Sequence, residues 1–501
     1  MRQAIYQKII DIRIHLIMFI FVTMICLYYI LTIPSNSIWH DQALAINLAK
    51  DILNGDFPLV GYLHSNKMHS FPAFYYLIAP LVLISENPLF LYWSVAIVNA
   101  LGIILVAKYI YKKFGIQEFF LYLVFFATHA STLFFSSFFW NPNYIPFFMS
   151  LFLISFLKYL HGNTSVLSFH FAGIILNIMV QMMPQSIVLI PAFVFILVLF
   201  KKLPSIFNQI MHVFFQFVMV YPWLHYYFFI FGWENFVPSQ KLYKGFTISI
   251  NEYMNYLGGW VLNSEYTTYL AYGTNTYPYE NLIDVFLKIS SFIALFLVIY
   301  ATSLSFKRIK LKHYLNFYIV GNSNHYLTKE KCIIILSLIN FSCILFLLTG
   351  MQMVSYHFQF LAPVLALKMS LLVSFEKKYK KLLIFALSFL ILIQGLFSYW
   401  RAFSEYKKPY VTDIGYSDQF LNYFNYNCLE GSAAYILDPR GLHFFITSRG
   451  KNGKKYCGDL ILVLKDHFTK SEIIRWFLEK KYTKSDLKFK DYMIWTSVEY
   501  L

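Results

Sequence analysis

The sequence has few charged residues: only 13% of its 501 residues are Asp, Glu, Lys or Arg. A soluble domain carries about 25% charged residues, so this composition excludes an ordinary soluble protein. Apolar runs long enough to cross a membrane as helices, about 20 residues each, recur along the whole chain instead. The sequence therefore predicts a polytopic α-helical membrane protein.

Cysteine and nucleotide-binding motifs are also scarce. Of the five Cys, three (Cys26, Cys332 and Cys343) lie in apolar runs and are expected to behave as small core hydrophobes. Cys428 and Cys457 lie in the polar C-terminal part, where they form either a disulfide or a pair of free thiols. The chain contains no P-loop and no dinucleotide-binding fingerprint, so we expect no nucleotide ligand.

Positive charge is the exception to this scarcity. The net charge is +16, which by itself is also found in proteins that bind nucleic acid. Much of the Lys and Arg, however, stands in short clusters between apolar runs, as the positive-inside rule requires of cytoplasmic loops. We therefore expect no nucleic-acid partner, and we use the clusters to assign the topology.

The segment FPAFYYLIAPLVLIS, residues 71–85, decides that topology. If it does not span the membrane, the basic clusters around Lys112, Lys202, Arg308 and Lys378 all fall on the cytoplasmic side. The segment is short for a span and carries Pro80 in its middle. We therefore predict a helix lying in the outer interface. About eleven spans remain, at residues 14–33, 89–107, 118–136, 143–160, 165–183, 185–200, 208–231, 284–305, 331–350, 353–374 and 383–402.

The N-terminal run is predicted to be an uncleaved first span, because it is long for a signal peptide and no A-x-A-like site follows it. With the N-terminus in the cytoplasm, residues 34–88, residues 232–283 and the tail from 403 face outward. The tail contains the strand-like runs AAYILD, LILVLKD and YMIWTSV and the helix-like run KSEIIRWFLEKK. The sequence thus predicts a transmembrane domain over 1–402 and a small extracytoplasmic α/β domain over 403–501.

The stretch SIWHDQALAINLAKDILNG, residues 37–55, follows the first apolar run. Leu44, Ala45, Leu48 and Ile52 recur at the spacing of one helix face, and a Gly ends the pattern. Asp41 stands at the start of this predicted helix. It is either an N-cap stabilised by the helix dipole or a carboxylate that the same dipole keeps ionised for chemistry at the outer interface.

Several segments together resemble the membrane glycosyltransferases of the GT-C fold, in the family 39-like branch related to protein O-mannosyltransferases and the lipid A aminoarabinose transferase. The similar segments are WHDQALAINLAKDILNG, FPAFYYLIAPL, FFWNPNYIPFF and HFQFLAPVLAL, in that order. The chain departs from the family where Gln42 replaces a second acid, where Asn141 and Asn143 stand in place of a further acid, and where Met183 replaces a His.

The resemblance implies a donor sugar carried on a polyprenyl phosphate at the outer membrane face. Attack by an acceptor hydroxyl requires a base, and the resemblance places Asp41 in that role, with inversion at the sugar carbon. The leaving phosphate needs cationic or hydrogen-bonding groups, for which Lys67, His69 and His357 are the candidates. Lys67 is alternatively a lysine that snorkels to the interface, and His357 alternatively packs as an ordinary polar residue.

The predicted sugar-binding residues are His40, Gln42, Trp140, Asn141, Asn143 and Gln181. Trp140 is alternatively part of an aromatic belt, and Asn141 and Asn143 alternatively start a helix with Pro142. Gln181 lies within a span and must face a cavity or a neighbouring helix. His40 and His69 without an acid at ligand spacing are a weak metal signal, so we expect neither a metal nor another cofactor.

The sequence therefore predicts a multi-pass inner-membrane enzyme that moves a sugar from a polyprenyl phosphate to a cell-envelope glycan, lipid or protein. Two alternatives stay open. A surface-polysaccharide polymerase carries its key His and Arg in a large late loop, whereas residues 232–283 contain neither. A lipid-linked glycan transporter or flippase requires polar or charged residues near the middle of several spans.

Overall fold

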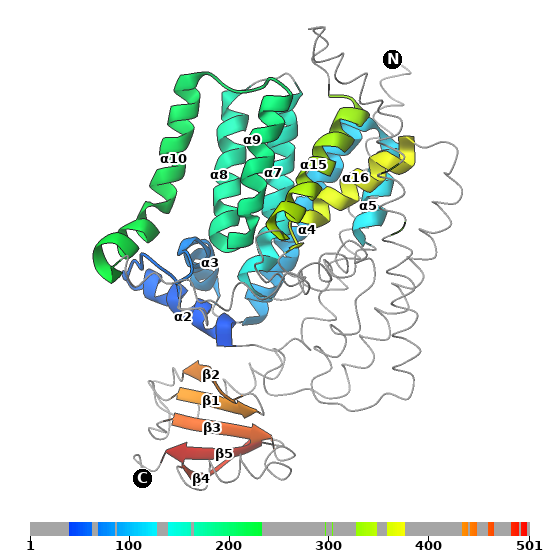
Figure 1. Ribbon diagram of the computed structural model, residues 1–501. Helices are drawn as coiled ribbons and strands as arrows, with labels where there is room; N and C mark the ends of the chain where they lie inside the picture. Colours follow the sequence, from blue (N-terminus) through cyan, green and yellow to red (C-terminus); the bar gives the residue numbers. More distant parts are fainter. Residues whose placement is uncertain are drawn as a thin grey trace. The chain divides into compact units, whose positions relative to one another are not determined.

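The computed structural model describes residues 40–62, 69–85, 88–127, 139–161, 165–232, 327–347 and 358–375, the single residues Phe296 and Ser303, and five strands between residues 433 and 497 (Figure 1). The chain divides into two compact units. The first contains Met1–Tyr29, Pro58–Phe74 and Ser94–Ala402, and the second contains Ile30–Phe57, Tyr75–Trp93 and Phe403–Leu501.

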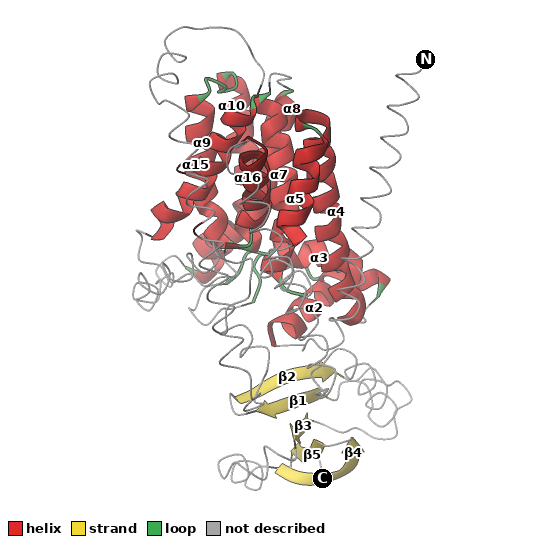
Figure 2. Ribbon diagram, turned by 90° about the vertical axis from the view of Figure 1, so that its right-hand side faces the viewer, coloured by secondary structure: helices red, strands yellow, loops and turns green. Residues whose placement is uncertain are grey.

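The described part of the first unit is helical (Figure 2). The contacts between its helices fall into two groups: α8 packs on both α7 and α10, while α16 packs on α5, α7 and α15. Helix α7 belongs to both groups and so joins them into one bundle, and α15 also contacts α9. Its elements are α4 (Pro88–Phe114, which begins in the second unit), α5 (Ile116–Ala127), η2 (Asn141–Tyr144), α7 (Ile145–Leu160), α8 (Val166–Met182), η3 (Pro184–Val188), α9 (Leu189–Leu199), α10 (Ile206–His225), η4 (Tyr226–Phe231), α15 (Lys329–Leu347) and α16 (Leu361–Phe375).

Three of the described helical segments are long and apolar enough to cross a membrane: Phe90–Phe114, Asn141–Leu160 and Ile206–Phe231. They coincide with predicted spans, and shorter apolar helices lie at Ile116–Phe126, Val166–Met182, Pro184–Leu199 and Leu361–Ser374. The predicted spans at 14–33, 284–305 and 383–402 lie outside the described residues, apart from the single residues Phe296 and Ser303. The structure thus shows an apolar helical membrane-protein architecture, and the count of about eleven spans stays a prediction.

Aromatic side chains fill the core where α7, α8 and α9 meet. The rings of Phe156 and Phe193 lie 4.9 Å apart, and those of Phe169 and Phe193 lie 5.8 Å apart. Phe152 stacks on Phe156 at 5.4 Å. Aromatic pairs at such distances add to the stabilisation from burial alone, so this cluster fixes how the three helices pack.

Helix α10 differs from the other long helices because most of its apolar side chains are exposed. Ile206 is 75% exposed, Phe207 is 70% exposed and Val213 is 66% exposed. Exposed apolar residues along a whole helix are the composition expected of a surface that faces lipid tails. Helix α10 carries Pro222, which lacks a backbone N–H, in its last turn, and it ends at His225, directly before the π-helical turn η4.

The second unit contains α2 (His40–Leu53), most of α3 (Ala73–Ile84) and a five-stranded sheet. Both helices were predicted from the sequence. Helix α2 is followed by Gly55 with φ +100°, a left-handed conformation that favours glycine. Helix α3 contains Pro80, as expected; its placement in the membrane interface stays a prediction.

The sheet has the strand order β2-β1-β3-β5-β4. Strand β1 pairs in parallel with β3, and all other neighbours are antiparallel. Three of the strands confirm the runs expected from the sequence, whereas β2 and β4 were not predicted. The predicted helix at 470–481 lies outside the described residues, so the α/β character of the tail stays a prediction. The strands are β1 (Ala433–Asp438), β2 (Gly441–Thr447), β3 (Asp459–Leu464), β4 (Tyr482–Phe489) and β5 (Tyr492–Ser497).

Candidate functional site

Helix α2 begins at His40, which places Asp41 in its first turn. The side chains of Asp41 and His40 lie outside the described residues. The free N–H groups and the dipole of a helix N-terminus stabilise a carboxylate in this position. The backbone therefore provides the setting that the sequence predicted for an ionised Asp41, and it fits a helix cap equally well.

The buried stripe of α2 is shifted from the one expected. Ala45 and Ala49 are almost completely buried, Gln42 is 1% exposed, and Leu44 and Leu48 are only half-buried. These positions follow the helical period of 3.6 residues, with the centre of the stripe about one position away from the predicted one. Gln42 was predicted to contact sugar; its side chain is buried, and that role stays a prediction.

His69 lies just before α3, is half-buried and makes four hydrogen-bond contacts with protein groups. Its Nδ1 lies 2.9 Å from the carbonyl oxygen of Gly61, so Nδ1 carries the proton and donates. Its Nε2 faces the hydroxyl of Tyr226 at 3.4 Å. The backbone N–H of His69 donates to the Tyr227 hydroxyl at 2.8 Å, and Trp223 Nε1 donates to the His69 carbonyl at 3.2 Å.

These contacts fix the segment before α3 to the end of α10 and to η4. Phe71 adds a stacked contact with Trp223, with ring centroids 4.7 Å apart. The long Nε2 contact is the one that a ligand would most easily replace, since the other three His69 bonds are shorter. The predicted phosphate-binding role of His69 stays a prediction, and Lys67 and His357 lie outside the described residues.

A buried group of amides ties α4, η2 and the start of α16 together. Gln359 Nε2 donates to Asn143 Oδ1 at 2.8 Å, and Asn99 Nδ2 donates to the Asn143 carbonyl at 2.8 Å. Asn99 Oδ1 accepts the backbone N–H of Phe147 at 3.2 Å. We call Asn99, Asn143 and Gln359 the amide joint; each is at most 2% exposed.

The amide joint gives Asn143 a structural role. Its side chain is fully buried and its oxygen is occupied by Gln359, so a sugar hydroxyl has no access to that oxygen in this arrangement. Asn141, two residues earlier, donates from Nδ2 to the carbonyl of Met182 at 2.7 Å. That carbonyl belongs to the last turn of α8, where backbone acceptors lack helical partners. Asn141 and Trp140 are half-buried, and their predicted contact with sugar stays a prediction.

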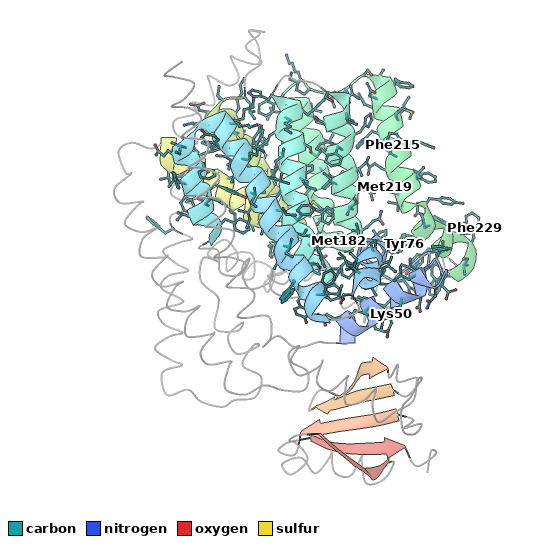
Figure 3. All side chains as sticks on the ribbon, turned by 180° about the vertical axis from the view of Figure 1, so that it is seen from behind. Lys50, Tyr76, Met182, Phe215, Met219 and Phe229 are labelled. Carbon is teal, nitrogen blue, oxygen red and sulfur yellow. The ribbon has the colours of Figure 1, made fainter. Side chains whose placement is uncertain are left out.

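Gln181 faces a neighbouring helix, which is one of the two environments that the sequence predicted for it. It is 5% exposed, and its Nε2 donates to Asn177 Oδ1 at 2.8 Å and to the Met219 carbonyl of α10 at 3.1 Å. Figure 3 labels Met182 at the end of α8 and Met219 on α10 (Figure 3). Gln181 is thus held by α10 beside the α8 terminus that Asn141 caps.

Gln181 is one end of a hydrogen-bonded chain between α8 and α10, which we call the polar ladder. Asn177 Nδ2 donates to Gln216 Oε1 at 2.7 Å, Gln216 Nε2 lies 3.3 Å from His212 Nε2, and His212 Nδ1 lies 3.4 Å from His170 Nδ1. With the proton of His212 on Nδ1, every member donates to the next. Chains of this kind polarise and strengthen one another.

Two features of the bundle were missed from the sequence. The amide joint uses Asn99 and Gln359, single polar residues inside apolar runs. Lys368, in the middle of α16, is 2% exposed and has no ion-pair partner among the described residues. The sequence did contain a signal for Lys368, since it is the one lysine in the apolar run LAPVLALKMSLLVSF. An ionisable residue inside a span is a marker of function.

Metal ligands do not gather in the part of the chain that the structure describes: no group of three or more His, Cys, Asp or Glu could hold a metal ion there. His40 and His69 were the weak candidates, and the side chain of His40 lies outside the described residues. The neighbours of the His69 ring are a backbone carbonyl and a tyrosine, which are not a zinc ligand set.

Comparisons with known proteins add a structural likeness. The chain matches no protein-family model, and no curated protein matches it. A solved structure, ArnT from Cupriavidus metallidurans bound to undecaprenyl phosphate, aligns with 96% of this chain and 97% of its own. The aligned residues are 10% identical and the TM-score is 0.48.

Proposed function

We propose that the chain is an inverting glycosyltransferase that moves a sugar from a polyprenyl-phosphate donor to a hydroxyl of a cell-envelope acceptor on the outer face of the inner membrane. The observation that carries the proposal is the start of α2 at His40, which places Asp41 in the first turn of a helix. The ordered series of segments resembling GT-C glycosyltransferases, in a bundle of apolar helices, supports it.

The proposed reaction is a single displacement. The acceptor oxygen attacks the anomeric carbon, the bond from that carbon to the phosphate oxygen breaks, and the acceptor proton passes to the Asp41 carboxylate. The bonding electrons leave with the polyprenyl phosphate. Lys67, His69 Nε2 and His357 are proposed to stabilise the charge that develops on this leaving group.

The other predicted residues take proposed roles according to their surroundings. His40, Trp140 and Asn141 are proposed to contact the sugar, because Trp140 and Asn141 are half-buried and not enclosed. Gln42, Asn143 and Gln181 are buried, and we propose that they hold the contacting segments in place. The C-terminal α/β domain is proposed to face the same outer compartment.

The test compares wild type with Asp41→Asn in detergent, using a panel of radiolabelled polyprenyl-phosphate sugars and a crude envelope acceptor. Asp51→Asn is the matched control, because Asp51 lies on the same helix and is exposed. We expect transfer by wild type and by Asp51→Asn, and a loss of at least about 100-fold in Asp41→Asn, as for other general bases. Equal transfer by a folded Asp41→Asn would reduce Asp41 to a helix cap and refute the mechanism.

One observation favours a second candidate function, a lipid-linked glycan transporter. Lys368 is buried inside an apolar helix, and such residues mark transport pathways as well as enzyme sites. Fluorescent lipid-linked sugars in proteoliposomes separate the two functions. Flipping by wild type that Lys368→Met abolishes, without sugar transfer from any donor, would replace the enzyme by a transporter.

A further inference from the structure

At one end of the helical bundle, polar contacts join the ends of several helices; we call this set of contacts the frame. The Tyr159 hydroxyl, at the end of α7, donates to the Lys202 carbonyl after α9 at 2.8 Å. The Leu327 N–H, before α15, donates to His161 Nδ1 at 3.1 Å. Lys329 of α15 forms an ion pair with the buried Glu118 of α5. These contacts hold the ends of four helices together.

Positive side chains are brought close together on this frame. The charge of Lys202 acts on Lys331 of α15. Burial and the charge of Lys113, at the end of α4, lower the pKa of His161. The structure describes two acids on these helix ends: Glu118 pairs with Lys329, and Glu330 stands between Lys329 and Lys331 in the first turn of α15. We call the three lysines Lys113, Lys202 and Lys331, together with the uncharged His161, the basic rim.

The turn after α9 presents a further lysine in an unfavourable backbone conformation. Lys201 has φ +51°, a left-handed value that residues other than Gly and Asn rarely adopt. The N–H of Lys202 bonds the Leu197 carbonyl and the N–H of Lys201 bonds the Val198 carbonyl, which is a Schellman end with lysine where glycine is usual. Backbone strain of this kind is concentrated at functional sites.

Apolar side chains follow the lysines directly. Leu203 is 51% exposed, Ile206 is 75% exposed and Phe207 is 70% exposed. An amphipathic surface with lysines beside exposed apolar residues matches the boundary between lipid head groups and acyl chains. A free phosphate would use only the lysines, whereas a phospholipid would use both parts of this surface.

We propose that the basic rim is a binding site for the head-group phosphate of an anionic phospholipid. The lipid would place its phosphate among Lys202, Lys331 and Lys113, and its acyl chains beside Leu203 and Phe207. An anion here relieves the repulsion between neighbouring positive charges. The face that carries the rim is the one predicted to be cytoplasmic, where anionic lipids attract basic segments. The proposal is independent of the sugar-transfer chemistry.

The test measures the melting temperature of the purified full-length protein in detergent, as separate additions of phosphatidylglycerol, phosphatidylcholine and inorganic phosphate are titrated. We expect phosphatidylglycerol alone to raise the melting temperature of wild type at low salt, with a weaker effect at high salt because surface charges are screened. Each lysine near an anionic surface contributes about fivefold to affinity. The apparent affinity should therefore fall about fivefold in Lys202→Gln and roughly 25-fold in Lys202→Gln/Lys331→Gln.

Two controls keep the outcome interpretable. Lys50→Gln removes the same charge from α2 and should leave the lipid response within about twofold of wild type. Lys202→Arg/Lys331→Arg keeps both charges and should retain the response, which shows that the glutamine variants did not fail merely by misfolding. An unchanged lipid response in Lys202→Gln/Lys331→Gln would overturn the site. An equal response to inorganic phosphate would overturn its assignment to a lipid.

Discussion

Gln359 donates from its Nε2 to the Oδ1 of Asn143 at 2.8 Å, across 216 residues of sequence, with both side chains completely buried. This bond joins two segments that the sequence singled out separately, FFWNPNYIPFF and HFQFLAPVLAL. Gln359 follows the predicted site residue His357 by two positions, and Asn143 follows the predicted site residue Asn141 by two positions. The amide joint is therefore the contact through which two predicted parts of the site are held together.

Breaking this bond should destabilise the fold measurably. We expect Gln359→Leu to lower the free energy of unfolding by about 1–2 kcal/mol, because the buried oxygen of Asn143 loses its donor. Asn143→Ala should have a similar effect. In a double-mutant cycle by SDS titration, the coupling should be about 0.6–1.7 kcal/mol, the range found for hydrogen bonds between membrane helices. Additive effects would show that the bond contributes nothing.

The amide joint also shows what the sequence could and could not predict. The apolar runs predicted the helices at 143–160 and 165–183 to within two residues, because lipid-compatible segments differ strongly from loops. Asn99 and Gln359 were missed, because their partner lies far away in the chain and a single amide in an apolar run has no periodicity to detect. Their role depends on tertiary packing alone.

The same limit applies to the second unit. Strands β1, β3 and β5 were predicted from continuous apolar runs, whereas β4, YTKSDLKF, mixes lysines and serine with apolar residues. Its pairing with β5 decides its structure, because strand propensity depends on neighbouring strands. On α2, the predicted stripe is confirmed at Ala45 and Ile52, which are buried, whereas Leu44 and Leu48 are only half-buried and the unpredicted Ala49 is buried.

The ion pair between Glu118 and Lys329 should be asymmetric to mutation. Glu118 is buried while Lys329 is about one-third exposed, with side-chain exposures of 5% and 34%. Lys329→Met leaves a buried carboxylate without its partner, and we expect a loss of about 2–3 kcal/mol, somewhat below the range for fully buried pairs. Glu118→Gln leaves an amine that can reach water, so its cost should be below about 1 kcal/mol.

Thermal unfolding of these two variants in detergent checks the asymmetry. The double variant Lys329→Met/Glu118→Gln should regain most of the stability lost in Lys329→Met, because no buried charge remains. If Glu118→Gln is the more damaging change, the carboxylate contributes through contacts other than this ion pair.

His161 should make stability depend on pH. Burial and the charge of Lys113 lower its pKa in the folded state, and its Nδ1 must be unprotonated to accept the Leu327 N–H. The unfolded state, with a pKa of about 6.5, therefore binds a proton first as the pH falls. Stability from this group is complete above about pH 6.5 and is lost as the pH falls from there through the lowered folded pKa.

The measurement is the melting temperature of wild type and His161→Gln between pH 8 and pH 5. Glutamine can accept the same backbone N–H without titrating. We expect the wild type to lose more stability than the variant below about pH 6.5, and no difference in slope above it. Parallel curves over the whole range would mean that protonation of His161 does not break the contact between the ends of α7 and α15.

The polar ladder depends on a glycine. A Cβ added to Gly173 of α8 would collide with the Cε1 and Nε2 atoms of His212 and approach Gln216 Nε2 at 3.1 Å. Gly173→Ala should therefore push His212 out of the ladder and separate α10 from α8. Because alanine favours helix more than glycine does, by about 1 kcal/mol, an isolated α8 would be stabilised by the same change. A net loss of stability in Gly173→Ala would therefore be caused by the collision with His212 and not by helix propensity.

The decisive comparison is between Gly173→Ala and the double variant Gly173→Ala/His212→Ala, in the same SDS titration. Removing the His212 ring clears the space for the new methyl group, so the double variant should be more stable than Gly173→Ala, although it lacks a ladder member. His212→Ala alone should cost less than about 1.7 kcal/mol, the upper range for interhelical hydrogen bonds in membranes. If the double variant is instead the least stable of the three, the ladder holds α10 through the histidine itself. The close approach that glycine permits would then be incidental.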